Sequence, residues 1–192
     1  MIRFGILGDI GSGKSHIAKL FRYPVFNADL EVSRIYSSNK KIFEKVQKIL
    51  PKYFSSFPMK KHQMINAIMA NESNLKKITK IIHPEVKKKM NIFLKKYKNK
   101  RIVILDIPLL LENKLNKKKD VLIFIDSKKS EIFKRLKKRK NFNNQLLKKL
   151  KKLQFSLKYK KKISKFIIKN NFTNKFIQKD IKSILQTVKQ ND

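Results

Sequence analysis

All four glycines of this 192-residue chain lie between positions 5 and 13, where they form part of a phosphate-binding pattern. The segment from Gly8 to Ser15 matches G-x-x-x-x-G-K-[ST], with an apolar run before it and a helix-like run after it. Glycine allows the backbone to curl around a phosphate chain, and the N-terminus of the following helix adds about half a positive charge. Lys14 is predicted to reach the β- and γ-phosphates, and Ser15 to bind Mg²⁺. The segment therefore predicts a nucleoside triphosphate site.

The chain has only 13 acidic residues, so an aspartate at the end of a predicted strand is informative. Asp29 follows a short apolar run and could accept a proton from an attacking hydroxyl, or it could equally cap the next helix. Asp106 ends the clearest apolar run and could bind Mg²⁺, or form the turn before Pro108. Asp126 ends another run, and we expect it to cap the helix that follows.

Arginine is rare in this chain, because six of its 49 basic residues are Arg and the others are Lys. Arg135 and Arg139 are spaced four apart, on one face of a predicted helix. A planar guanidinium binds phosphate oxygens in a fork that lysine cannot form, so this pair is predicted to contact phosphate. The alternative is a solvated helix face. The predicted nucleotide-binding residues are therefore Gly8, Asp9, Ile10, Gly11, Ser12, Gly13, Lys14, Ser15, His16, Arg135 and Arg139.

Apolar runs and helical periodicity alternate along the chain, which predicts an α/β fold. Strands are predicted at 2–7, 25–29, 101–106, 121–126 and 166–168. Helices are predicted at 14–22, 30–37, 128–140, 143–162 and 173–189, with several more between 40 and 98. Strands that are apolar throughout are typical of a parallel sheet covered on both faces, where ligands bind at the carboxyl ends of the strands. The phosphate loop and the three aspartates all fall at such ends.

The composition limits the class of protein further. The formal net charge is +36, from 49 Lys and Arg against 13 Asp and Glu, which suits nucleic acid or an anionic membrane. The lysines are scattered and accompanied by abundant Asn, Ile and Phe, so we favour a composition bias over a selected nucleic-acid role. The length of 192 residues suits a single domain, and the absence of Cys excludes disulfides but leaves the redox compartment open. Because the chain has no apolar stretch of about 20 residues and no signal-peptide pattern, we expect a cytoplasmic protein.

Several segments of the chain, taken in order, resemble the dephospho-CoA kinase family. They are Gly5–Ser15, Phe26–Asp29, Ile82–Pro84, Asp106–Glu112, the Arg135 and Arg139 pair, Gln154 and Ile167–Asn170. The phosphate loop is shared by many kinases, whereas the Asn-Ala-Asp, His-Pro and Pro-Leu-Leu-x-Glu segments in this order are far more specific. The resemblance covers most of the chain.

The resemblance implies a P-loop nucleotide-kinase-like three-layer fold with a five-stranded parallel sheet. Its parts would be a core (1–38, 100–126 and 164–192), a helical substrate lobe (about 39–99) and a lid (about 127–163). The implied reaction is transfer of the ATP γ-phosphate, with Mg²⁺, to the ribose 3′-hydroxyl of 3′-dephospho-CoA. We expect a monomer with no specific nucleic-acid partner and no membrane partner.

The resemblance also implies roles for individual residues. Asp29 matches the proposed base of the family, Lys14 and Arg139 would also be catalytic, and Arg139 would lie in the lid. The metal ligands would be Ser15 and Asp106. The substrate side would be lined by Asp29, His83, Pro84, Pro108, Leu109, Leu110 and Glu112.

The chain departs from the family pattern at several positions, among them Asp9, His16, Asn27, Lys165 and Phe172. A carboxylate about 5 Å from a phosphate would cost ~3 kcal/mol at an effective dielectric of about 20, so Asp9 is expected to point outward. Two other functions stay open. One is a nucleoside or nucleotide monophosphate kinase, which would carry the same loop. The other is a nucleic-acid-binding protein with a vestigial loop.

Overall fold

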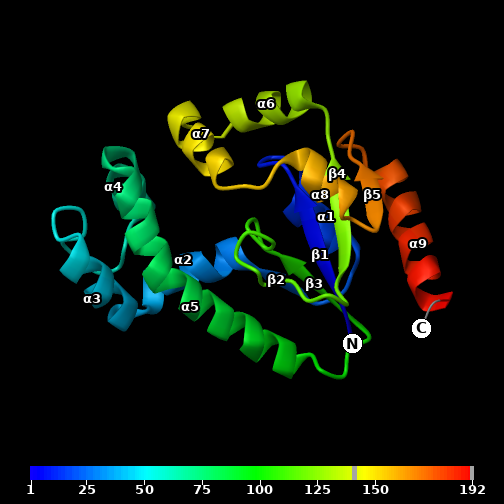
Figure 1. The fold of residues 1–192 in the computed structure, drawn as a ribbon, viewed down its shortest axis with the longest axis horizontal. Coiled ribbons are helices and arrows are strands. Elements are labelled where there is room, and N and C mark those ends of the chain that lie inside the picture. Colours follow the sequence, from blue (N-terminus) through cyan, green and yellow to red (C-terminus); the bar gives the residue numbers. More distant parts are fainter. Residues whose placement is uncertain (140–141, 191–192) are drawn as a thin grey trace. The chain divides into compact units, whose positions relative to one another are not determined.

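A computed structural model describes residues 1–139 and 142–190, apart from the side chains of residues 174 and 175. Within these residues five strands form one parallel sheet in the order β2-β3-β1-β4-β5, as Figure 1 shows. The strands are β1 (Ile2–Gly8), β2 (Val25–Asn27), β3 (Ile102–Asp106), β4 (Val121–Asp126) and β5 (Phe166–Lys169). The predicted α/β fold with a five-stranded parallel sheet is therefore confirmed.

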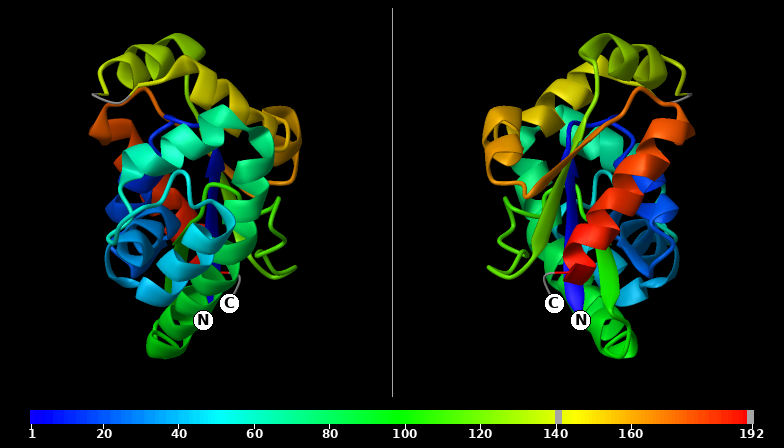
Figure 2. Two further views of the ribbon diagram at one scale, coloured as in Figure 1. Left: turned by 90° about the vertical axis from the view of Figure 1, so that its left-hand side faces the viewer. Right: turned by 90° about the vertical axis from the view of Figure 1, so that its right-hand side faces the viewer.

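The sheet is held by apolar residues that alternate between its two faces. Phe4 and Ile6 of β1 are fully buried with α1 (Lys14–Leu20) and α9 (Asn174–Gln190), and Figure 2 shows α9 lying along the sheet. Each such buried side chain contributes about 1.5–3 kcal/mol. On the other face, a Cβ added at Gly5 would come within 2.6 Å of Cδ2 of Leu110. The segment after β3 therefore packs closely on β1, and a side chain at position 5 would require Leu110 to shift.

The chain divides into two compact units. The sheet unit comprises Met1–Asn27, Tyr97–Phe142 and Lys151–Asp192. The helical unit comprises Ala28–Lys96 and Asn143–Leu150. The sheet unit contains the whole parallel sheet, and with it the phosphate loop.

The helical unit is built from α2 (Ala28–Ser38), α3 (Lys40–Ile49), α4 (Lys61–Ala70) and α5 (Glu72–Lys96), together with Asn143–Leu150. The long helix α5 contacts the other three, and apolar residues at helical spacing, such as Ile78 and Ile82, are buried along it. The side chain of Asn39 accepts a hydrogen bond from the backbone N–H of Ile42 at 3.1 Å, which caps the start of α3. Several helices between 40 and 98 were predicted, and the structure confirms them.

Three remaining helices join β4 to β5, and two predicted boundaries among them are wrong. These helices are α6 (Lys129–Lys137), α7 (Asn144–Lys152) and α8 (Leu157–Lys162). The single helix predicted at 143–162 is two helices, because Ser156 starts a new one by accepting a hydrogen bond from the N–H of Tyr159 at 3.2 Å. The helix predicted at 128–140 ends at Lys137, which leaves Arg139 beyond it.

The strand predicted at 25–29 is also shorter than expected. It ends at Asn27, and Asp29 lies in the first turn of α2. Because α2 begins directly at Ala28, Asp29 belongs to the helical unit instead of closing the strand.

Among the described residues, no helix is both long and apolar enough to cross a membrane.

Candidate active site

The loop between β1 and α1 has the backbone geometry that its glycines allow. Gly8, Gly11 and Gly13 have φ values of 145°, 88° and 91°, which residues with a side chain rarely adopt. A Cβ at Gly13 would also lie 2.5 Å from Nδ2 of Asn170. Conformation and space therefore both require glycine at the last loop position before the helix.

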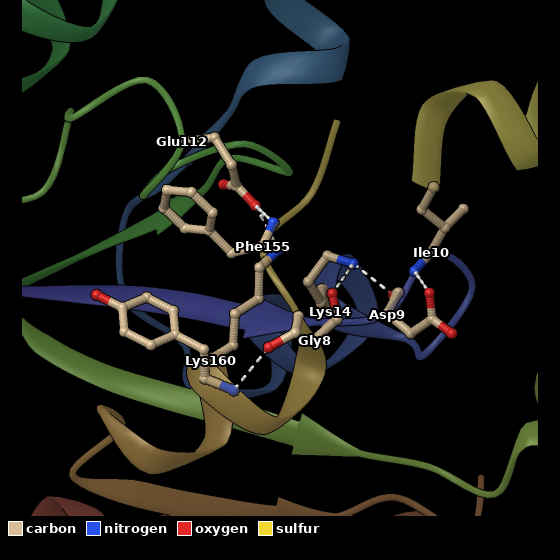
Figure 3. A network of polar contacts seen from close by, with 9 residues as sticks. Gly8, Asp9, Ile10, Lys14, Glu112, Phe155 and Lys160 are labelled. Atoms are coloured by element: carbon tan, nitrogen blue, oxygen red, sulfur yellow. Dashed lines mark hydrogen bonds and ion pairs between the residues drawn. The ribbon is translucent and has the colours of Figure 1, made fainter. Parts of the chain in front are cut away.

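The ammonium group of Lys14 lies over this loop. Its Nζ donates hydrogen bonds to the carbonyl oxygen of Gly8 at 3.2 Å and to that of Asp9 at 2.7 Å, as Figure 3 shows. Lys14 is only partly exposed. The loop thus binds the Lys14 ammonium through its carbonyl oxygens. The sequence predicts that this ammonium contacts phosphate.

Two side chains that follow other strands donate hydrogen bonds to the loop at the carbonyl oxygen of Ser12. Nδ2 of Asn170, which follows β5 and is buried, donates to the carbonyl oxygen of Ser12 at 2.8 Å. The hydroxyl of Ser127, which follows β4, donates to the same oxygen at 3.0 Å. Neither residue was assigned a site role from the sequence. Their positions directly after two strands were the available signal, because strand ends share one edge of a parallel sheet.

The two predicted metal ligands are joined by a third residue. Nδ2 of Asn27 donates a short hydrogen bond to Oδ2 of Asp106 and a longer one, 3.5 Å, to the hydroxyl of Ser15. Asp106 is 2% exposed, whereas Ser15 is exposed. Asn27 and Asp106 are register partners at the ends of β2 and β3, so the sheet itself brings the amide to the carboxylate.

These residues fit a Mg²⁺ ion that keeps part of its water shell. Mg²⁺ prefers oxygen ligands and is commonly bound through one or two protein groups and substrate phosphates. Ser15 offers a hydroxyl oxygen and Asp106 a carboxylate, which is the right chemistry. Among the described residues no group of three or more His, Cys, Asp or Glu could hold a metal ion by itself. A metal at this position therefore needs the phosphates as well.

Three of the predicted substrate residues belong to the helical unit. Asp29 is exposed in the first turn of α2, and His83 and Pro84 lie within α5, which contacts α2. Burial lowers the pKa of His83, which favours a neutral imidazole. Burial also raises the pKa of Tyr36, and the nearby charge of Asp29 raises it further.

The other predicted substrate residues lie in the turns after β3, in the sheet unit: Pro108, Leu109, Leu110 and Glu112. Glu112 is nearly buried, and its Oε1 binds Nζ of Lys160 at 2.8 Å and the N–H of Phe155 at 2.8 Å (Figure 3). Lys160 is 1% exposed, and Oε2 of Glu112 is buried with no hydrogen-bond partner among the described residues. Glu112 therefore anchors the start of α8. Lys160 was missed, because one lysine in so basic a chain gives no signal.

Two expectations about aspartates are wrong. Asp9 does not point outward: it is 7% exposed, its Oδ1 accepts a hydrogen bond from the N–H of Ile10 at 2.7 Å, and its Oδ2 pairs with Lys151 at 2.9 Å. Asp126 does not cap α6, whose N-terminal cap is Lys128; it pairs with Lys161 at 2.7 Å. In both cases a lysine distant in sequence neutralises the carboxylate.

Arg135 and Arg139 do not lie on one face of a helix, as the sequence predicted, because α6 ends at Lys137. Arg135 lies in α6 and its guanidinium carbon is 4.3 Å from the ring centre of Phe172, whose φ of 63° is unusual for a residue with a side chain. Arg139 follows the end of α6 and is exposed, with its backbone N–H bonded to the carbonyl of Leu136 at 3.1 Å. His16 lies exposed in α1.

Comparison with known proteins decides the family. The family model described as dephospho-CoA kinase matches residues 2–175. The chain belongs to the dephospho-CoA kinase family. Dephospho-CoA kinases of Wolbachia sp. subsp. Brugia malayi and of Wolbachia pipientis wMel are 28% and 27% identical to it, covering 96% and 97% of both chains in each pair.

Solved structures agree on the fold. TT1252 from Thermus thermophilus superposes with a TM-score of 0.76 at 23% identity, covering 97% of both chains. Dephospho-CoA kinase from Campylobacter jejuni gives 0.63 at 19% identity, covering 97% of this chain and 96% of the other. The P-loop kinase fold predicted from the sequence is thus confirmed.

As a dephospho-CoA kinase family member, the chain is a kinase, a phosphotransferase that acts on a small molecule. Its sheet unit brings together the phosphate loop, Ser15, Asn27 and Asp106. Its helical unit carries Asp29, His83 and Pro84. The predicted roles of these residues stay predictions.

Proposed function

We propose that this kinase transfers the γ-phosphate of ATP to the ribose 3′-hydroxyl of 3′-dephospho-CoA, giving CoA and ADP. The observation that carries the proposal is the hydrogen bonding of Asn27 to both Ser15 and Asp106. These residues lie beside a glycine loop whose positive φ values allow the backbone to curl around phosphate. A hydroxyl and a carboxylate joined beside a phosphate loop are suited to a magnesium nucleotide. The membership in the dephospho-CoA kinase family supports the choice of acceptor.

On the nucleotide side, Lys14 would exchange the carbonyl oxygens of Gly8 and Asp9 for phosphate oxygens of ATP. That exchange costs little, because the ammonium replaces two neutral acceptors by charged ones. Ser15 and Asp106 would hold Mg²⁺, with the Asn27 amide keeping the Asp106 carboxylate in one orientation. When bound, Mg²⁺ neutralises charge on the phosphates. Arg135 and Arg139, on the proposed lid, would add guanidinium contacts to the nucleotide.

On the acceptor side, Asp29 would accept the proton of the attacking 3′-hydroxyl. His83, Pro84, Pro108, Leu109, Leu110 and Glu112 would line the substrate. We propose that residues about 39–99 form the substrate lobe and residues about 127–163 the lid. We further propose a monomer that acts in the cytoplasm without a specific nucleic-acid or membrane partner.

The test is a coupled ADP-release assay with MgATP and three separate acceptors: 3′-dephospho-CoA, adenosine and AMP. We expect turnover with 3′-dephospho-CoA at least about 100-fold faster than with the other two, since a site built for the larger acceptor uses its remote part to raise the rate. Mass spectrometry and phosphorus NMR of the product should find one added phosphate, on the 3′ position. Faster turnover of adenosine or AMP would contradict the proposal and favour a nucleoside or nucleotide kinase.

A further inference from the structure

Asp9 places a carboxylate inside the phosphate loop, one residue after Gly8. The side chain is held on both oxygens: Oδ1 accepts from the N–H of Ile10 at 2.7 Å, and Oδ2 from Nζ of Lys151 at 2.9 Å. The main-chain oxygen of the same residue accepts from Lys14 at 2.7 Å, as Figure 3 shows. The carboxylate therefore belongs to the loop that the proposed function assigns to a triphosphate.

A carboxylate in this position opposes the binding of a polyanion. Like charges a few ångströms apart repel, and they do so more strongly where solvent is partly excluded. The Asp9 side chain is 9% exposed, so water screens it poorly. The positive charge of Lys14 is required for the phosphates themselves. A second cation is needed if the loop is to remain attractive to a triphosphate.

Lys151 has the geometry to supply that charge. Its ammonium lies 2.9 Å from Oδ2 of Asp9, and its side chain is 45% exposed. This differs from the surface pair of Lys134 and Glu131, which are 72% and 42% exposed and 3.3 Å apart. A pair with one nearly buried partner at hydrogen-bond distance is screened less than such surface pairs.

Two lysines of α8 are engaged elsewhere. Lys160 binds Glu112 at 2.8 Å, and Lys161 binds Asp126 at 2.7 Å. Asp9, Glu112 and Asp126 are thus each matched to one lysine from the stretch 151–161. Lys151 is the member of that set whose partner lies in the phosphate loop.

We propose that Lys151 is a positioning residue for nucleotide binding, which neutralises and holds Asp9 so that the loop accepts a nucleoside triphosphate. The inference rests on the proposed function, because it requires a triphosphate at the loop. Lys151 acts through Asp9 and makes no contact with the phosphates. It follows that its contribution depends on two things: the presence of the Asp9 charge, and the number of phosphates on the ligand.

The experiment is calorimetric titration of the full chain with MgATP and, separately, with adenosine, which has no phosphate. The variants are Lys151→Met, Asp9→Asn, the double variant, and Lys152→Met as a matched control, since Lys152 is the exposed neighbour at the end of α7. We expect Lys151→Met to weaken MgATP binding about tenfold, equivalent to about 1.4 kcal/mol, and adenosine binding by less than about twofold. Lys152→Met should bind both ligands as the wild type does.

The double-mutant cycle separates this role from a structural one. In the Asp9→Asn background, Lys151→Met should change MgATP affinity less than about twofold, because no carboxylate remains to be neutralised. The defect of Lys151→Met alone should shrink as NaCl is raised from about 0.05 to about 0.5 M. Circular dichroism melting of each variant checks that the fold is retained.

Three outcomes would overturn the inference: no loss of MgATP affinity in Lys151→Met, an equal loss in the Asp9→Asn background, or an equal loss for adenosine. The second would mean that Lys151 contacts phosphate directly, and the third that it only supports the fold. Failure of the wild type itself to bind MgATP would instead overturn the proposed function, and the inference with it. The two failures are thus told apart by the wild-type titration.

Discussion

Asn27 donates a hydrogen bond from Nδ2 to Oδ2 of Asp106, its register partner across β2 and β3. The same Nδ2 lies 3.5 Å from the hydroxyl of Ser15. The amide thus connects the end of the sheet to the first turn of α1. The neutral Asn27 side chain therefore orients both groups proposed to bind Mg²⁺, the Ser15 hydroxyl and the Asp106 carboxylate.

Replacing Asn27 by Ala removes this orientation without changing charge. We expect the Mg²⁺ concentration that gives half-maximal activity to rise about 3- to 10-fold, since positioning partners of metal ligands typically contribute about 10–100-fold to metal affinity or activity. The measurement is the rate of ADP release against Mg²⁺ at fixed ATP. Asn91→Ala, at an exposed position in α5, is the matched control. A Mg²⁺ dependence like that of the wild type would remove Asn27 from this role.

Lys14→Ala should abolish most of the kinase activity. The ammonium that now lies 2.7 Å from the Asp9 carbonyl oxygen is the group proposed to neutralise the phosphates during transfer. Loss of one preorganised charge contact of this kind typically lowers kcat by about 10²–10³. Helical content, measured by circular dichroism, should stay at the wild-type level. Full activity in this variant would rule out the loop as the nucleotide site.

Asp29→Asn keeps the size of the side chain and removes only its basicity. General-base assistance is typically worth about 10²–10⁴ in rate, so kcat with 3′-dephospho-CoA at saturating MgATP should fall by that order while ATP still binds. Glu31→Gln, in the same first turn of α2, is the matched control and should stay near the wild-type rate. Asp106→Asn should act mainly on the apparent Mg²⁺ affinity. A fall below threefold in the Asp29 variant would contradict its assignment as the base.

Lys160→Met should destabilise the protein, because it leaves the Glu112 carboxylate nearly buried without its counter-charge. Removing one partner of a buried ion pair typically costs about 3–5 kcal/mol. The measurement is the free energy of unfolding from urea denaturation. Adding Glu112→Gln to Lys160→Met should recover much of the loss. The control is Lys161→Met, whose pair with Asp126 is half-exposed, and which should cost less than about 1 kcal/mol.

The free energy of unfolding should fall in mild acid, because His83 takes up a proton more readily in the unfolded chain. Burial lowers its pKa below the ordinary 6.5, so the unfolded chain takes up a proton at a higher pH than the folded chain. The stability that this residue contributes is therefore complete above about pH 6.5 and is lost as the pH falls towards the lower pKa of the folded state. His83→Gln should reduce the difference between the urea midpoints at pH 7.5 and pH 5.5. An unchanged difference would show that other groups cause the acid sensitivity.

The amino-acid sequence by itself determined the sheet and the phosphate loop. Both follow from local sequence patterns. Uninterrupted apolar runs predict buried parallel strands, and the spacing of Gly8, Gly13 and Lys14 predicts a loop that curls around phosphate. Helix boundaries were less predictable. Nothing in the lysine-rich stretch marks the break before α8 except the capping serine Ser156, and the helix that contains Asp29 begins directly after β2.

Only the tertiary structure decided the partners of the charged and polar side chains. Asp9 pairs with a lysine 142 residues away and Asp106 with an asparagine 79 residues away, so no local spacing connects them. Local periodicity reports which face of an element is apolar, but it carries no information on which of many lysines reaches a given carboxylate. That choice follows from packing, because burying Asp9, Glu112 or Asp106 leaves each needing a partner within hydrogen-bond distance.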